Sequence, residues 1–188
     1  MTEPVKEIAG LQPPPPGKYE LDRAHTAVEF VARHILTKVR GRFTDFDGWI
    51  QVDENPEESS IEVEIKTASI QTNVEQRDNH LKSDDFLNVE KWPAMTFRSA
   101  AVRNAGGATF ELEGDLTIRD VTRRVTLQGE YLGTDTNPSG STVLAATAKT
   151  TLVREDWNVS WNMMLETGGF LVSKTVDLEI EVEAIKVG

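Results

Sequence analysis

The stretch Val176–Ala184 reads Val-Asp-Leu-Glu-Ile-Glu-Val-Glu-Ala and decides the fold. Apolar residues occupy its even positions and acids its odd positions. Successive side chains of a β-strand point to opposite faces, so this pattern predicts a strand with an apolar inner face and an acidic outer face. Ile61–Lys66 repeats the alternation far away in the chain. Two half-buried strands that lie so far apart in the sequence indicate that strands recur along the chain, as in an all-β protein.

The same alternation extends over most of the chain from Tyr19 onward. It predicts further strands, with 17–23 as a lead-in to the first, over 26–34, 41–53, 94–99, 109–119, 123–132 and 141–154. Gly106-Gly107, Arg119-Asp120 and the segment 137–140 supply turns between them. Eight strands can stack as two sheets or close as one, and closure removes the exposed sheet edges.

Two segments interrupt the alternation. Residues 73–87 carry Asn and Asp capping candidates, which predicts a short helix and loop. Residues 155–173 predict a second irregular insertion, in which two tryptophans and two methionines form either an adaptable lid over an apolar mouth or a small satellite core. Residues 1–18 end in four prolines and a glycine and predict an extended tail, leaving 19–188 as one domain.

Charge and composition exclude several functions. The net charge is -11, which opposes binding to nucleic acid and to anionic lipid headgroups. The absence of cysteine excludes disulfides and thiolate chemistry. The first ten residues contain acids and a proline where a secretion signal has basic and apolar residues, and no apolar run is long enough to span a membrane, so we expect a cytoplasmic protein.

Three histidines are the candidates for chemistry. None has the spacing of a zinc motif, and we expect no metal. Alternation along 26–34 places His34 on the inner face together with Phe30. His80 follows Arg77 and Asp78, and Asp78 could orient it for acid-base catalysis, which leaves a lipid-modifying enzyme as one alternative function.

Several motifs, in order, resemble the YceI-like family of polyisoprenoid-binding proteins. They include His25-Thr26 with the following alternation to His34, the run Arg77-Asp78-Asn79-His80 to Phe86, Trp92-Pro93-Ala94 and Gly114–Thr122. Arg154 and Asp156 resemble the family's Arg-x-Asp step, although Trp157-Asn158 replaces the usual aromatic-glycine pair.

The resemblance implies an extended eight-stranded antiparallel barrel of lipocalin-like shape, with one or two short helices in the insertions. It also implies that a long amphiphilic lipid, such as a polyisoprenoid or isoprenoid quinone, is held inside, with no other cofactor and no catalysis. We expect inward apolar side chains to contact the lipid tail: Val28, Phe30, Phe43, Phe46, Trp49, Phe86, Met95, Phe97, Phe110, Leu112, Leu116, Leu127 and Met164. The polar end would meet His34, Arg77, His80 or Arg154.

The inward set leaves a second alternative open. It mixes large aromatic residues with small ones, such as Ala146, Ala148, Gly114 and Gly129. The small residues either leave room for a ligand or face bulky partners across a filled core. A filled barrel would instead serve as an interaction module, and the irregular insertions or edge strands could support a homodimer.

Overall fold

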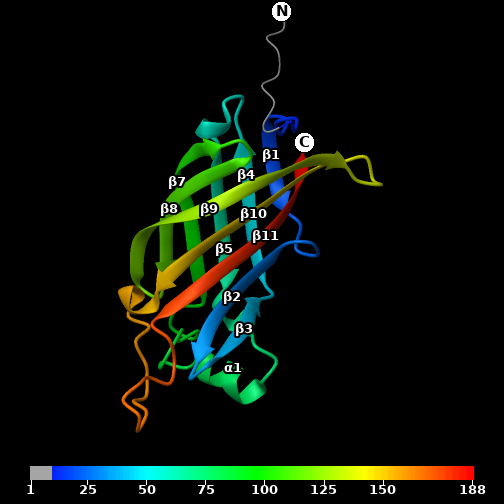
Figure 1. Ribbon diagram of the computed structural model, residues 1–188. Helices are drawn as coiled ribbons and strands as arrows, with labels where there is room; N and C mark the ends of the chain where they lie inside the picture. The colour runs from blue at the N-terminus through cyan, green and yellow to red at the C-terminus, as the bar shows by residue number, and fades with distance from the viewer. Residues whose placement is uncertain (1–9) are drawn as a thin grey trace, which may run out of the picture.

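A computed structural model describes residues 10–188 and shows one sheet wrapped into a tall, strongly twisted barrel (Figure 1). Eight antiparallel strands form a closed ring in the order β1-β4-β5-β7-β8-β9-β10-β11, and β11 pairs again with β1. The predicted eight-stranded barrel is therefore confirmed.

The strands that form the ring vary widely in length. Their bounds are β1 Gly17–Leu21, β4 Phe46–Val52, β5 Ser60–Lys66, β7 Ala94–Gly106, β8 Thr109–Ile118, β9 Val121–Thr136, β10 Thr142–Val153 and β11 Thr175–Val187. Hairpins at Gly106-Gly107, Arg119-Asp120 and 137–140 join β7 to β10, as the turn residues predict.

Three further strands extend the barrel beyond the ring. β2 (Ala27–His34) pairs with the first half of β11, while β1 pairs with the end of β11, so the two share one edge. β3 (Thr37–Phe43) pairs with β2, and β6 (Ile70–Gln71) pairs with β3. The predicted single strand over 41–53 is wrong in this respect: the chain leaves the sheet at 44–45, where β3 ends and β4 begins.

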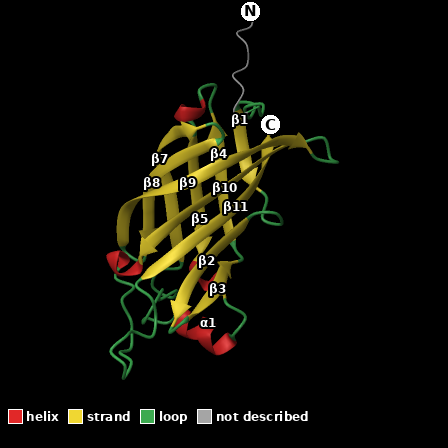
Figure 2. Ribbon diagram, viewed as in Figure 1, coloured by secondary structure: helices red, strands yellow, loops and turns green. Residues whose placement is uncertain are grey.

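Helical structure is short and lies at the two ends of the barrel (Figure 2). α1 (Glu75–Lys82) falls in the first predicted insertion, and the 3₁₀ turn η2 (Thr67–Ser69) precedes it. The second insertion begins with the 3₁₀ turn η3 (Arg154–Trp157), and η1 (Pro56–Glu58) lies at the opposite end. We call these the α1 end and the η1 end. Within residues 10–188, no helix is long and apolar enough to cross a membrane.

The buried side chains form three separate clusters instead of one continuous core. The first lies toward the η1 end around Tyr19 and Leu144, and the second includes Val28 and Phe43. The third joins Leu116 to residues of the second insertion, including Trp157. Partly buried side chains link these clusters, since Leu21 packs against the first two and Ile118 packs against the second and third.

Candidate ligand-binding cavity

A cavity of about 390 Å³ runs through the barrel. Its lining extends from Pro14 and Pro56 at the η1 end to Val159 and Val172 at the α1 end. Most lining side chains are apolar, and the charged ones are Glu57 and Arg154. The volume lies in the range of about 300–1,000 Å³ that is typical of small-molecule sites. The interior is therefore open, which rejects the filled core that the sequence left as an alternative.

Inward side chains of β5 and β11 show that the cavity is continuous along the strands. Val176, Leu178, Ile180 and Val182 of β11 all line it and are only half-buried, although they point away from the outer surface. Ile61, Val63 and Ile65 of β5 behave in the same way. The apolar surface that these residues leave uncovered is available for a hydrophobic ligand.

Three aromatic rings lie against the wall because each covers a glycine of the neighbouring strand, directly opposite for Phe30 and Phe110 and diagonally for Phe97. Phe30 covers Gly41, Phe97 covers Gly114, and Phe110 covers Gly129. A Cβ atom built on any of these glycines would lie less than 3.0 Å from the ring. The glycines thus let bulky rings lie close to the strands, which keeps the centre of the barrel open.

Eleven of the residues that the sequence predicts for the site line this single cavity. They come from β2, β3, β7, β8, β9, η3 and the segment after α1: Val28, Phe30, Phe43, Phe86, Met95, Phe97, Phe110, Leu112, Leu116, Leu127 and Arg154. The structure brings these side chains together around one space.

Phe46 and Met164 lie outside the cavity for opposite reasons. Phe46 points inward but is buried in the cluster around Phe43 and Met95 and does not line the cavity. Met164 lies in the second insertion and is 70% exposed, because the loop carries it beyond the end of the barrel.

His34 and Trp49 differ from their predicted inward orientation. His34 ends β2 and is exposed, because the strand extends past the ring there: it still pairs with β3, but on its other side it has only an isolated bridge to Val172. Trp49 occupies an outward position of β4, whose inward side chains are those of Phe46, Ile50 and Val52. The Lys18 ammonium lies 5.6 Å from the centre of the Trp49 ring.

Arg77 binds the chain that leads into α1. Its Nε donates to the Thr72 hydroxyl at 2.7 Å, and its Nη2 donates to the Thr72 carbonyl at 2.9 Å. Asp78 also binds Thr72, since it accepts from the Thr72 backbone N–H at 2.8 Å. The predicted pairing of Asp78 with His80 is therefore absent, because Thr72 occupies the Asp78 carboxylate.

His80 belongs to a small cluster beside the cavity wall. Its Nε2 lies 2.8 Å from a carboxylate oxygen of Asp85. Its ring meets the rings of Phe86 and Trp161 edge-on, with centroids 5.1 and 4.6 Å away. Of this cluster only Phe86 lines the cavity, and His80 does not.

Arg154 is a buried cation that organises the second insertion. Its Nε donates to the Ser173 carbonyl at 2.8 Å and its Nη1 to the Val159 carbonyl at 2.7 Å. Nη2 is buried without a partner among the described residues. Burial lowers the pKa of Arg154 from its usual value. The guanidinium thus holds both ends of the insertion against the cavity.

The second insertion contains the satellite core that the sequence offered as one of two arrangements. Trp157 is buried, lines the cavity and donates its indole N–H to the Leu116 carbonyl at 3.0 Å, as in a satellite core. Met163 and Met164, in the middle of the segment, are exposed.

The segment 11–16 lies across the η1 end. The hydroxyl of Tyr131 donates to the Gln12 carbonyl at 2.6 Å, and the hydroxyl of Tyr19 donates to the Pro15 carbonyl at 2.7 Å. Leu11 packs against the cluster around Tyr19, and Pro14 lines the cavity. The predicted extended tail therefore contacts the barrel over these residues, while its first nine residues lie outside the described part of the chain.

The inward residues of β5 and β11 are the largest group that the sequence-based site omits. Their alternation is the clearest in the chain and already assigns them to the inner face. Both strands adjoin the cavity through a whole row of side chains. The alternation of these strands identifies their inward residues, and in a barrel with an open interior such residues line the cavity.

The closed antiparallel ring around an apolar cavity defines a lipocalin-like barrel, a class whose interior accommodates hydrophobic molecules. A sequence model of the YceI-like domain matches residues 19–184, and the chain belongs to the YceI-like family. A UPF0312 protein of Pseudomonas putida strain W619 is 36% identical over 173 residues, which cover 90% of this chain and 86% of that protein. A UPF0312 protein of Pseudomonas aeruginosa strain LESB58 is 36% identical over 172 residues, covering 89% and 86%.

Solved structures share the same barrel. The YceI protein of Campylobacter jejuni is 28% identical, with a TM-score of 0.72 over 83% of this chain and 90% of that one. BcnA of Burkholderia cenocepacia gives a TM-score of 0.75 at 21% identity, over 87% and 98% of the two chains. A polyisoprenoid-binding domain of Saccharophagus degradans gives 0.68 at 14% identity, over 90% and 98%.

Proposed function

We propose that this protein binds a long-chain amphiphilic lipid, a polyisoprenoid or an isoprenoid quinone, along the inside of the barrel, and that it sequesters or carries this lipid without altering it. The observation that carries the proposal is the apolar cavity of about 390 Å³ that extends from the η1 end to the α1 end. A long, narrow, almost wholly apolar space fits a flexible hydrocarbon chain better than it fits a compact polar metabolite.

The comparisons support the same class of ligand. The S. degradans domain is described as polyisoprenoid-binding, and the C. jejuni YceI protein has the same barrel. Both proteins share the barrel fold with this chain.

Burial of the tail would supply most of the affinity. Each buried CH₂ group contributes about 0.8 kcal/mol, so a long tail offers more binding energy than association needs after its ordering costs. Discrimination between lipids then depends on a few polar groups. Two nitrogens of Arg154 already donate hydrogen bonds to backbone carbonyls. A neutral quinone or alcohol head therefore suits the site better than a diphosphate, which needs several free cations.

Native mass spectrometry of freshly purified protein tests the proposal. We expect a lipid-bound mass whose ligand is released by organic extraction and carries a long isoprenoid chain. Intact lipid recovered unchanged after incubation supports binding without chemistry. Conversion of the lipid that is lost in His80→Ala would instead establish the enzymatic alternative.

A matched pair of variants locates the lipid inside the barrel. Ala148 lines the cavity, whereas its neighbour Lys149 is exposed. Ala148→Phe should fill the cavity and reduce the bound lipid, while Lys149→Phe adds the same ring outside and should leave the bound lipid unchanged. Equal lipid content in two folded variants would contradict an interior site.

A further inference from the structure

Large apolar side chains are exposed together at the α1 end of the barrel. In the turn between β2 and β3, Leu36 is 85% exposed and Ile35 is 49% exposed. In the second insertion, Met164 is 70%, Met163 55% and Phe170 48% exposed. We call these five residues the apolar tip. Single exposed apolar residues are common, but a contiguous group of this kind marks an interaction surface.

Backbone hydrogen bonds make the apolar tip one surface although its halves are far apart in the sequence. The Ile35 N–H donates to the Leu171 carbonyl at 2.9 Å, and the Leu171 N–H donates to the Met163 carbonyl at 2.9 Å. Met164 and Phe170 face each other as an isolated antiparallel bridge. Figure 1 shows the insertion and the end of β2 at the same end of the barrel, beyond the ring.

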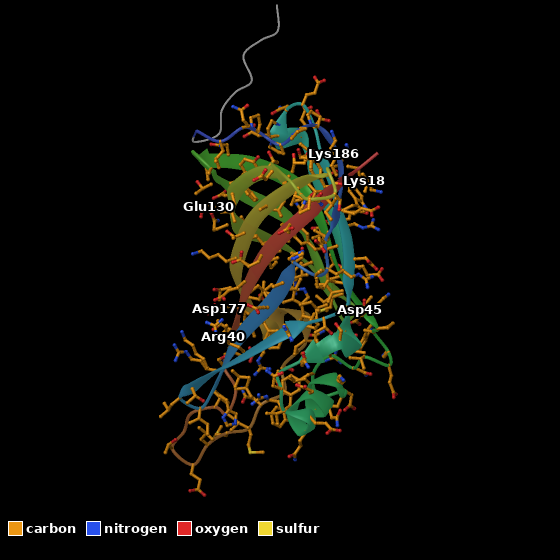
Figure 3. All side chains as sticks on the ribbon, turned by 90° about the vertical axis from the view of Figure 1, so that its right-hand side faces the viewer. Lys18, Arg40, Asp45, Glu130, Asp177 and Lys186 are labelled. Atoms are coloured by element: carbon orange, nitrogen blue, oxygen red, sulfur yellow. The ribbon has the colours of Figure 1, made fainter. Side chains whose placement is uncertain are left out.

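The segment that carries Ile35 and Leu36 is basic, although the chain has a net charge of -11. Residues 31–43 contain four basic residues and no acid. Two of them have partners, since Arg40 pairs with Glu179 and Arg42 bonds to Gln71. Figure 3 shows Arg40 on the side of the barrel toward the α1 end, with Lys18 and Lys186 toward the η1 end.

The two basic residues nearest the tip lack any carboxylate partner. Arg33 and Lys38 lie directly opposite each other in the register of β2 and β3. Like charges at such positions destabilise a strand pair. Neither forms an ion pair within the described part of the chain. Lys174 adds a third cation, 5.7 Å from the centre of the Phe170 ring, while Glu166 is the one acid of the segment 160–174. This local excess of positive charge suits an anionic partner.

The apolar tip is also continuous with the cavity wall. Val172 lines the cavity and forms a bridge with His34, directly beside Ile35. Ala32, two residues before His34 on the same strand, lines the cavity as well. The tip therefore adjoins the cavity wall through Val172.

We propose that the α1 end is a docking surface for an anionic lipid bilayer. Ile35, Leu36, Met163, Met164 and Phe170 enter the headgroup region, and Arg33, Lys38 and Lys174 contact the lipid phosphates. Apolar side chains combined with basic residues are the combination that holds proteins at anionic membrane surfaces. The inference extends the proposed function, since a protein that holds a membrane lipid must collect it or deliver it somewhere.

Co-sedimentation of the full chain with phosphatidylcholine vesicles, with and without phosphatidylglycerol, tests the docking surface. A protein of net charge -11 should avoid anionic vesicles unless a local surface binds them. We expect stronger binding to vesicles that contain phosphatidylglycerol, and weaker binding as salt is raised. The double variant Leu36→Asp with Met164→Asp should lower the partition coefficient at least about tenfold. Lys38→Glu should remove the preference for phosphatidylglycerol.

The control pair Leu132→Asp with Val187→Asp is matched in charge. Leu132 on β9 is 47% exposed and Val187 on β11 is 36% exposed, both outside the tip, so the control pair adds the same two charges elsewhere and should bind vesicles as the unaltered chain does. Unfolding temperatures verify that all variants fold. No binding by the unaltered chain, or equal binding by the double variant, overturns the proposal. Self-association that is lost in the double variant, without vesicle binding, would assign the tip to a second copy instead. Native mass spectrometry on the same samples separates this result from failure of the lipid-binding function.

Discussion

The ring of Phe30 lies over Gly41, the residue that faces it in the register of β2 and β3. A Cβ atom at position 41 would overlap the ring, so the ring can lie against the wall only while position 41 is glycine. The residue type at position 41 of β3 therefore determines how far the Phe30 ring of β2 extends into the cavity.

Gly41→Ala should therefore push the Phe30 ring into the cavity. Overpacking of this kind costs about 1–3 kcal/mol, although the open interior gives the ring somewhere to move. We expect a modest fall in unfolding temperature and a larger fall in bound lipid, measured by extraction and mass spectrometry.

Two controls separate this effect from a general effect of alanine. Gly169→Ala adds a methyl group where the nearest atom lies 3.9 Å away, and it should change neither stability nor lipid content through steric overlap. Gly41→Ala combined with Phe30→Leu should recover part of the bound lipid. A fall in lipid that Phe30→Leu cannot relieve would show that the ring is not responsible.

Arg154 should contribute to stability more than a surface arginine does. Its two buried hydrogen bonds join the Val159 and Ser173 carbonyls at the two ends of the second insertion. Arg154→Met keeps the apolar part of the side chain and leaves both carbonyls without this donor, which should cost about 2–4 kcal/mol. Urea denaturation measures the loss, and hydrogen exchange should locate it in residues 158–174.

Arg33→Met is the comparison for that variant, because Arg33 is exposed and has no carboxylate partner in the described residues. It should change the free energy of unfolding by less than about 0.5 kcal/mol. A similar loss in both variants would mean that the Arg154 hydrogen bonds stabilise the fold no more than an exposed side chain does.

Alternation predicted the barrel because its strands each have one apolar face, and a period of two is visible without knowledge of the partners. Alternation is not sufficient where a strand is interrupted or continues beyond the ring. Trp49 was assigned inward because the break at 44–45, which sets the parity of β4, has no strong signal in the sequence. His34 was assigned inward because alternation alone does not show that β2 continues past the ring.

The site was predictable to a similar extent. Inward apolar residues of the ring could be named because closure brings them all around one axis. The partners of polar residues could not, since they depend on loop geometry: Asp78 binds Thr72, and Asp85 is the carboxylate beside His80. The glycine-ring pairs also depend on register, which turns and bulges fix.

Tyr131 should hold the segment 11–16 over the η1 end. Its hydroxyl donates to the Gln12 carbonyl at 2.6 Å, and a hydrogen bond of this type contributes about 1 kcal/mol. Tyr131→Phe should therefore release the segment more often and increase exchange of the amide hydrogens around Gln12. If the segment also shields the ligand, dissociation of the bound lipid should be faster than from the unaltered chain. Unchanged exchange around Gln12 would show that other contacts, such as those of Leu11, hold the segment by themselves.

The turn between β1 and β2 should make stability depend on pH through His25. Its Nδ1 lies 2.7 Å from an Asp22 carboxylate oxygen and 3.8 Å from Glu183. The hydrogen bond to Asp22, together with the charges of Asp22 and Glu183, raises the pKa of His25 above its usual 6.5. The same hydrogen bond lowers the pKa of Asp22 below its usual 3.8.

The sign of each effect follows from the fact that the folded state favours the charged form of both groups. The contribution of His25 is complete below pH 6.5 and is lost as the pH rises through its higher folded pKa. The contribution of Asp22 is complete above pH 3.8 and is lost as the pH falls through its lower folded pKa.

His25→Gln should therefore lower the unfolding temperature most near about pH 5, and much less near about pH 9. His34→Gln is the control, because His34 has no carboxylate partner among the described residues, and it should show no such trend. A pH-independent difference between His25→Gln and the unaltered chain would mean that the imidazole acts there as a neutral hydrogen-bonding group.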